Sequence, residues 1–140
     1  MASGSAALDT IVAKLKGSSD PKRRYEYVLW LAKKLPPPPA ELSSDANRVR
    51  GCVSQVFVQP VVDGAVLHWQ GDSDAQITKG LLALLIQGLD GLTPQQVIAV
   101  DPGFIAETGL AASLTPSRAN GFLNILRHMQ AQAAALAGEG

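Results

Sequence analysis

The fold is decided by one stretch, VSQVFVQPVVDGAVLHWQGDSDAQITKGLLALLIQGL, at residues 53–89. It begins with two runs rich in β-branched and aromatic residues, which are typical of strands. Asp63-Gly64 separates the runs and predicts a tight hairpin turn. The expected cross-strand pairs are Val62–Ala65, Val58–Trp69 and Ser54–Ser73. Because side chains alternate along a strand, the face toward the core is expected to carry Val56, Val58, Val62, Leu67 and Trp69.

The second half of this stretch predicts a buried helix over residues 75–89. Apolar side chains fall on nearly all of its sides, as expected for a central helix with neighbours all round. The preceding Asp72-Ser73-Asp74 would provide an acidic or hydroxyl cap before Ala75. Pro60 cannot donate to a strand ladder, so its strand is expected at a sheet edge or with a bulge. Counting back along the hairpin places Cys52 beside residues 72–74.

The flanking sequence predicts helices on both sides of the hairpin. A short amphipathic helix ending at Gly17 is expected to bury Leu8, Ile11, Val12 and Leu15. Four further helix starts pair a capping side chain with proline, namely Asp20-Pro21, Thr93-Pro94, Asp101-Pro102 and Thr115-Pro116. Prolines 36–39 stop the second helix and are interpreted as a stiff spacer rather than an SH3-type ligand. The last helix is expected over residues 116–136.

This order of elements predicts the α+β class, with a small antiparallel sheet packed with helices. The length of 140 residues indicates a single domain over residues 1–140, and residues 1–7 are expected to be flexible.

Composition excludes several classes of protein. The chain is 46% hydrophobic and 17% charged, with 12 basic against 12 acidic residues. This balance lacks the basic footprint of a general nucleic-acid binder. The longest apolar run, residues 81–86, is too short for a bilayer, which takes about 20 residues. A single cysteine excludes an internal disulfide and favours a reducing compartment, and no signal peptide is visible.

Common catalytic and metal-binding motifs do not occur in the sequence. His68 and His128 fall in an expected strand and an expected helix without metal-ligand spacing, and with one cysteine they make at most a poor zinc site. There is no Gly-x-Ser-x-Gly elbow for serine hydrolysis and no glycine-rich phosphate loop. We therefore expect neither a metal nor a cofactor.

Cys52 lies in RVRGCVSQVFV, residues 48–58, where a polar loop meets a strand. A lone cysteine is usually a small buried hydrophobe. Here Gly51 permits a tight turn that leaves the sulfur uncrowded, while Arg48 and Arg50 supply positive charge that would lower the thiol pKa. Position alone leaves a reactive thiol and a structural one as alternatives.

Arg118 lies in LTPSRANG, residues 114–121, in the first turn of the last expected helix. A cation there opposes the helix macrodipole at a cost of about 0.3–1 kcal/mol. A solvated arginine tolerates that cost. A functional arginine at this position would meet an anion or an acidic partner.

Taken together, RVRGCVSQVFV, GDSDAQITKGLLALL and LTPSRANG resemble the SufE family of sulfur acceptors. The three motifs occur in the family's order, and the resemblance runs over residues 9–135. It implies the fold shared by SufE and the IscU scaffold. It also implies that Cys52 is the persulfide acceptor on a loop with Gly51 and Arg50, and that Arg118 and Asp74 govern loop position and partner contact.

The function implied by this resemblance is sulfur transfer in iron–sulfur cluster assembly. A SufS-type cysteine desulfurase, itself dependent on pyridoxal phosphate, would form a persulfide, and Cys52 would take its outer sulfur and pass it to a downstream scaffold complex. The chain would be a sulfur carrier and desulfurase activator rather than an independent enzyme. It would act in a bacterial cytoplasm or plastid stroma, without nucleic acid or membrane, and a homodimer is left open.

Two alternative functions share this fold. An IscU-like scaffold or metal-binding protein would hold a cluster, which normally needs several thiolates, whereas this chain has one cysteine. A non-catalytic regulatory adaptor of a desulfurase or scaffold, with an incidental cysteine, is the second alternative. If strand alternation extends back to Cys52, its thiol faces the core and is sheltered until a partner moves the loop.

Overall fold

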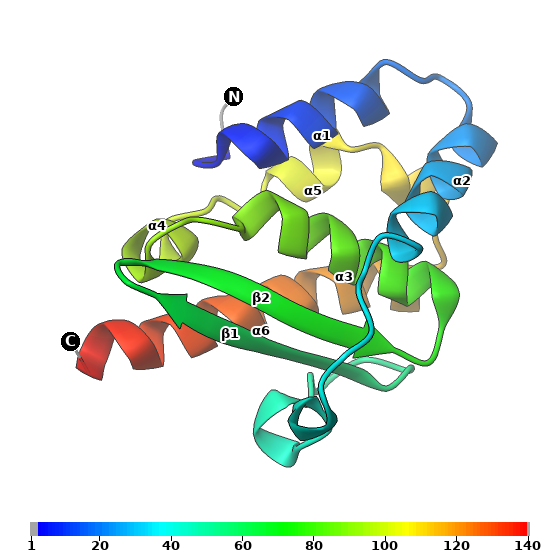
Figure 1. Ribbon diagram of the computed structural model, residues 1–140. Helices are drawn as coiled ribbons and strands as arrows, with labels where there is room; N and C mark the ends of the chain where they lie inside the picture. Colours follow the sequence, from blue (N-terminus) through cyan, green and yellow to red (C-terminus); the bar gives the residue numbers. More distant parts are fainter. Residues whose placement is uncertain (1–2, 140) are drawn as a thin grey trace.

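The computed structural model describes residues 3–139 and has the α+β architecture expected from the sequence (Figure 1). Within these residues the sheet is one antiparallel hairpin, and helices pack against it. In chain order the elements are α1 (Ala6–Lys16), α2 (Pro21–Ala32), the 3₁₀ helices η1 (Ala40–Leu42) and η2 (Asp45–Asn47), β1 (Val56–Asp63), β2 (Val66–Ser73), α3 (Gln76–Leu89), α4 (Pro94–Ile98), α5 (Phe104–Glu107), the 3₁₀ helix η3 (Leu110–Ala112) and α6 (Pro116–Glu139).

The hairpin turns through Gly64-Ala65, one residue later than predicted. Gly64 has a φ of 60°, in the left-handed region that glycine adopts without strain. The predicted register was therefore wrong by two residues, and the observed pairs are Val62–Leu67, Val58–Gly71 and Val56–Ser73.

A register error of two residues leaves each side chain on its predicted face, because side chains alternate with a period of two. The residues on the predicted core face are accordingly buried, namely Val56, Val58, Leu67 and Trp69. Val62 is the exception: it is 60% exposed, because it lies beside the open turn of the hairpin.

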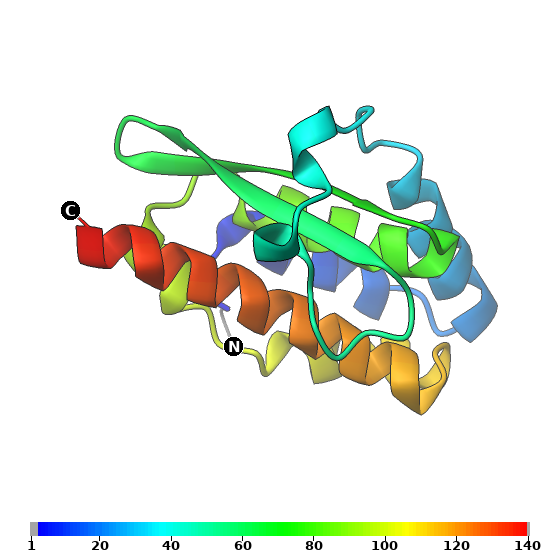
Figure 2. The same cartoon turned by 90° about the horizontal axis from the view of Figure 1, so that it is seen from below.

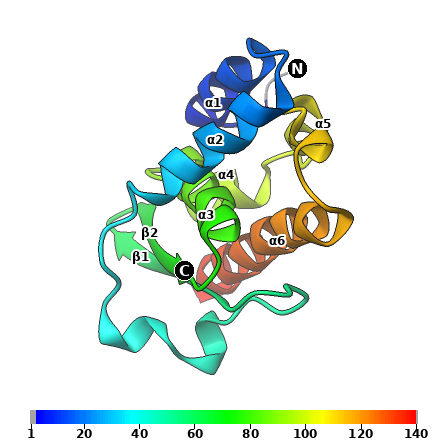
Figure 3. The same cartoon turned by 90° about the vertical axis from the view of Figure 1, so that its right-hand side faces the viewer.

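The buried centre of the molecule is α3, as predicted. It packs against β2 on one side and against α1 and α2 on the other (Figures 1 and 3). Two glycines permit these close contacts. A Cβ on Gly80 would lie 2.1 Å from the backbone oxygen of Val28 in α2, and a Cβ on Gly71 of β2 would lie 2.8 Å from the Leu82 side chain.

The long helix α6 runs alongside the hairpin and contacts β1, α3 and α4 (Figure 2). Its buried side chains are Phe122, Ile125, Leu126, Met129 and Ala133. Gln132 Nε2 also donates a hydrogen bond to the Val58 carbonyl oxygen of β1 at 2.8 Å. This helix therefore covers part of the β1 edge, which would otherwise present unpaired backbone groups.

Three of the four proline-marked helix starts were predicted correctly. Asp20 and Thr93 cap α2 and α4, and α6 begins directly after Thr115. The fourth start was wrong by two residues, because Asp101 accepts a hydrogen bond from Gly103 N and α5 begins only at Phe104.

The predicted cap of α3 was also wrong. Ala75 occupies the N-cap position and provides no side-chain hydrogen bond. The Ser73 hydroxyl accepts from Ala75 N at 3.3 Å, so the polar segment before α3 shapes the turn without capping the helix.

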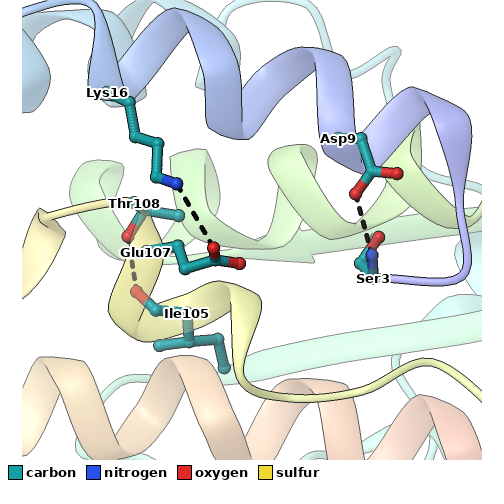
Figure 4. A network of polar contacts seen from close by, with 6 residues as sticks. All are labelled: Ser3, Asp9, Lys16, Ile105, Glu107 and Thr108. Carbon is teal, nitrogen blue, oxygen red and sulfur yellow. Dashed lines mark hydrogen bonds and ion pairs between the residues drawn. The ribbon is translucent and has the colours of Figure 1, made fainter. Parts of the chain in front are cut away.

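The start of the described chain is held against the core. Ser3 and Ser5 are buried, and Asp9 accepts a hydrogen bond from Ser3 N at 2.9 Å (Figure 4). In the same view, Lys16 of α1 pairs with Glu107 of α5 at 3.2 Å. Of the segment predicted to be flexible, residues 3–7 are thus tied to the fold, whereas residues 1 and 2 lie outside the described residues.

Candidate functional site

Cys52 lies on a short loop, residues 51–55, which we call the cysteine loop. Before it, Val49 N donates to Val56 O at 2.8 Å, so the chain doubles back on itself just ahead of β1. Gly51 turns the chain with a φ of 83°. Figures 2 and 3 show the loop, coloured teal, extending over the first turns of α6. The predicted strand start at residue 53 was therefore wrong, because β1 begins at Val56.

Hydrogen bonds tie both ends of the cysteine loop to the rest of the fold. At its start, Asn124 Nδ2 of α6 donates to Gly51 O at 2.9 Å. At its end, Asp74 Oδ1 accepts from Gln55 N at 2.9 Å, and Asp74 N donates to Gln55 O at 3.3 Å. The predicted pairing of Cys52 with residues 72–74 was wrong, because Gln55 lies opposite Asp74.

The Cys52 side chain is half-buried between the loop and α6. Its Sγ lies 3.7 Å from the Gly121 carbonyl oxygen, to which the thiol can donate. A Cβ added to Gly121 would lie 3.6 Å from the sulfur, so the helix surface passes directly beside it. Strand alternation ends at Val56 and does not reach Cys52. The thiol is therefore sheltered by α6 and not by the sheet.

Burial raises the pKa of the Cys52 thiol, because a thiolate loses solvation in a half-buried position. The prediction that Arg48 and Arg50 lower this pKa was wrong. Both arginines are exposed, and together with Arg127 they line a separate hollow that Cys52 does not border. Burial thus favours the protonated thiol over the thiolate in the resting structure.

Cys52 borders a pocket of about 240 Å³ between the cysteine loop, α3 and the start of α6. Its lining residues are Cys52, Val53, Ser54, Thr78, Thr115, Ser117, Arg118 and Gly121. The fold thus brings Cys52 and Arg118 to one pocket, although they are far apart in sequence. Arg118 lies in the first turn of α6 as predicted, and its side chain is exposed. Asp74 and Arg50 line other parts of the surface.

Sequence reasoning missed three residues that shape this site. Gly121 and Asn124 follow Arg118 at a spacing of three residues, which places them along one side of a helix. That periodicity was the available signal for both. Thr78 reaches the pocket from the buried α3, and its sequence context contained no signal for this.

The site therefore offers one thiol, one guanidinium and several hydroxyl groups. Among the side chains that the structure describes, no three His, Cys, Asp or Glu gather closely enough to hold a metal ion. His68 lies elsewhere, between Asp63 and Asp90. Nor does any helix in the described part of the chain combine the length and apolarity that crossing a membrane requires. Among the residues that line the pocket, Cys52 supplies the one thiol.

Residues 9–133 match the SufE family model, described as an Fe–S metabolism associated domain. The chain belongs to the SufE family. The resemblance inferred from the three motifs is thereby confirmed, and Cys52, Asp74 and Arg118 all fall within the matched range.

Relatives of this SufE-family chain come from several lineages. An uncharacterised SufE-like protein of Synechocystis sp. is 53% identical over 128 residues, covering 91% of this chain and 80% of that protein. A cysteine desulfuration protein SufE of Plasmodium vivax is 43% identical over 117 residues, covering 81% of this chain and 46% of its own length. SufE-like protein 1, chloroplastic/mitochondrial, of Arabidopsis thaliana is 39% identical over 127 residues, with coverages of 90% and 34%. The chain thus spans less than half the length of the latter two.

A solved structure shares the fold of this SufE-family chain over nearly its whole length. The solution structure of a hypothetical protein from Thermus thermophilus superposes with a TM-score of 0.82 at 29% identity. The match covers 96% of this chain and 98% of that one. The predicted α+β class is confirmed by this match and by the hairpin and helices described above.

Proposed function

We propose that this chain accepts persulfide sulfur from a SufS-type cysteine desulfurase onto Cys52, stimulates that enzyme, and relays the sulfur to a scaffold complex in iron–sulfur cluster assembly. One observation carries the proposal: the only cysteine lies on a loop held by a few hydrogen bonds, at a pocket that it shares with Arg118. Membership of a family described as Fe–S metabolism associated supports it. So does the name cysteine desulfuration protein carried by the Plasmodium relative.

The transfer step requires only thiol exchange. Cys52 loses its proton to solvent, and its thiolate sulfur attacks the outer sulfur of the desulfurase persulfide. A new sulfur–sulfur bond forms on Cys52, the bond between the two desulfurase sulfurs breaks, and the desulfurase cysteine leaves as a thiolate. Because one sulfur–sulfur bond replaces another, no external oxidant or reductant is needed.

The resting geometry indicates that the loop must move before this step. The sulfur faces Gly121 of α6, and burial keeps the thiol pKa above its ordinary value. Moving Cys52 into water or into a partner's site would remove that burial and favour the thiolate. Arg118, exposed at the same pocket, is suited to contact an anionic group of the partner once the loop has opened.

The other parts of the proposal rest on the same relatives. We propose residues 1–140 as a single SufE-like domain, in line with the family match over residues 9–133. The cyanobacterial and the chloroplastic/mitochondrial relatives support a bacterial cytoplasm or plastid stroma as its compartment. The adaptor alternative remains a distinct proposal that the following experiment separates from sulfur transfer.

The test is the intact mass of the protein after incubation with a SufS-type desulfurase and cysteine. We expect one added sulfur atom on the wild type and none on Cys52→Ser. Sulfur added equally to Cys52→Ser would contradict the acceptor role. Stimulation of the desulfurase by Cys52→Ser at the wild-type rate, without sulfur transfer, would support the adaptor instead.

The contribution of Arg118 is tested by desulfurase turnover. Arg118→Ala is expected to stimulate the enzyme at least about tenfold less than wild type, which corresponds to the loss of about 1.4 kcal/mol of interaction. Arg23→Ala, at an exposed arginine of α2 that does not line the pocket of Cys52 and Arg118, is the matched control. Equal stimulation by both variants would remove Arg118 from the proposed site.

A further inference from the structure

A second hollow lies on the other side of the cysteine loop, between η2 and α6. We call it the arginine groove, with a volume of about 420 Å³, and its lining residues are Asp45, Ala46, Arg48, Arg50, Asn124, Arg127 and His128. Arg48 and Arg50 flank the buried Val49 and point away from the core, as expected where side chains alternate along an extended chain. This alternation brings both guanidinium groups to the groove that Arg127 of α6 borders.

The charges in the arginine groove are unbalanced. Three arginines line it against one carboxylate, Asp45. None of the acidic side chains described in the structure forms an ion pair with Arg48, Arg50 or Arg127. The whole chain has a net charge of zero, so this concentration of positive charge is local and is not a consequence of a basic protein. Such a hollow attracts anionic groups and accelerates their association.

The groove is directly connected to the cysteine loop. Asn124 lines the groove and its side-chain amide donates to Gly51 O at 2.9 Å. Val53, next to Cys52, is 88% exposed, more than any other large apolar side chain among the described residues. On the far side of the loop lies Arg118. Exposed guanidinium groups and one exposed apolar group thus occur around the same loop, as do the charged rim and apolar centre of protein interfaces.

We infer that the arginine groove docks an acidic segment of the protein that exchanges sulfur with Cys52, while Val53 enters an apolar hollow of the same partner. This inference rests on the proposed function, because it assigns a surface to that partner. Arginine suits the role, since its planar guanidinium binds carboxylates through two parallel hydrogen bonds. Docking beside Gly51 would position the partner's persulfide next to the loop that carries the acceptor thiol.

The experiment is a binding titration of the full chain with a SufS-type desulfurase at low and high ionic strength. The double variant Arg50→Glu/Arg127→Glu is expected to bind at least about tenfold more weakly than wild type at roughly 0.1 M salt, with a smaller difference at about 1 M, where screening is strong. Lys14→Glu, a single charge reversal on α1 away from the cysteine loop, is expected to bind within about twofold of wild type. The double variant Arg50→Lys/Arg127→Lys is expected to recover part of the affinity, because charge is kept and the paired hydrogen bonds are lost.

A second measurement separates docking from damage to the loop. Cys52 of the Glu double variant is expected to react with a small neutral alkylating reagent at the wild-type rate, because neither arginine contacts the thiol. Faster alkylation in that variant would mean that the substitutions open the loop, and would overturn the docking explanation. Binding as tight as wild type at low salt would overturn the inference while leaving sulfur transfer to Cys52 intact. If the wild-type chain binds the desulfurase but Cys52 gains no sulfur, only the proposed function is overturned. If the wild-type chain does not bind the desulfurase at all, both the proposed function and the docking inference are overturned.

Discussion

At the scale of single residues, the pKa and the exposure of the Cys52 thiol depend on the residues packed against it and not on its neighbours in sequence. Arg48 and Arg50 are close to Cys52 along the chain, yet their side chains line the arginine groove. Gly121 of α6 lies beside the sulfur instead and partly shields it from water. The result is a higher thiol pKa and a protected resting state, the opposite of what the local charge pattern predicted.

Asn124→Ala is predicted to increase the reactivity of Cys52. The substitution removes the side-chain hydrogen bond to Gly51 O, which is worth about 1 kcal/mol net, so the open loop should be populated about fivefold more. The measurement is the rate at which a neutral alkylating reagent modifies the folded protein. Asn120→Ala, an exposed asparagine of the same helix, is the control, and an identical rate in both variants would show that Asn124 does not restrain the loop.

At the scale of secondary structure, the helices and the hairpin pack closely because small residues occur where they cross. Gly80 of α3 faces the α2 backbone, and Gly88 of α3 faces the Leu8 side chain of α1. These two contacts differ in kind. A flexible side chain can move aside for an added methyl group, whereas a backbone carbonyl in a helix cannot move without shifting the helix.

Gly80→Ala is therefore predicted to lower the free energy of unfolding by about 2 kcal/mol. A Cβ there would lie 2.1 Å from Val28 O, and overpacking of about 3 kcal/mol outweighs the gain of about 1 kcal/mol in helix propensity. Urea denaturation measures the change. Gly138→Ala in α6, where nothing lies within 4 Å, should be neutral or slightly stabilising, and a similar value for both would exclude the clash.

At the scale of the whole molecule, two histidines couple stability to pH with opposite signs. His68 of β2 contacts Asp90 at 2.7 Å and Asp63 at 3.0 Å. The hydrogen bond to Asp90 makes the largest contribution to raising the pKa of His68, and the hydrogen bond to Asp63 adds to it. Burial lowers the pKa of His128, and the polar backbone of Ala46 nearby opposes this shift. His68 therefore stabilises the fold when protonated, and His128 when neutral.

The stability contributed by His68 is predicted to be lost as the pH rises, and that contributed by His128 as the pH falls. The stabilisation by His68 is fully present below the unfolded-state pKa of about 6.5 and is lost as the pH rises through the raised folded-state pKa. That by His128 is present above about 6.5 and is lost as the pH falls. Urea midpoints of wild type, His68→Gln and His128→Gln across this range measure both. A wild-type advantage over His68→Gln that grows with pH would contradict the sign.

The fold and the candidate site were predictable where a short stretch of chain carries the information. Apolar periodicity identified α1, apolar residues on nearly all sides identified α3, and proline after a capping residue identified the starts of α2, α4 and α6. The three motifs identified the family and with it Cys52, Asp74 and Arg118 as candidates. Where a contact depended on how elements meet, prediction failed, as in the hairpin register and in the residue that lies opposite Asp74.

The sequence by itself thus determined the element types, the family and the identity of the candidate thiol. Only the tertiary structure decided that Asn124 restrains the cysteine loop, that α6 shelters the sulfur, and that Arg48, Arg50 and Arg127 meet in one groove. The physical reason is the range of each interaction. Hydrogen bonding within helices and hydrophobic periodicity act over a few residues of chain, whereas burial and charge act through space, between segments that only packing brings together.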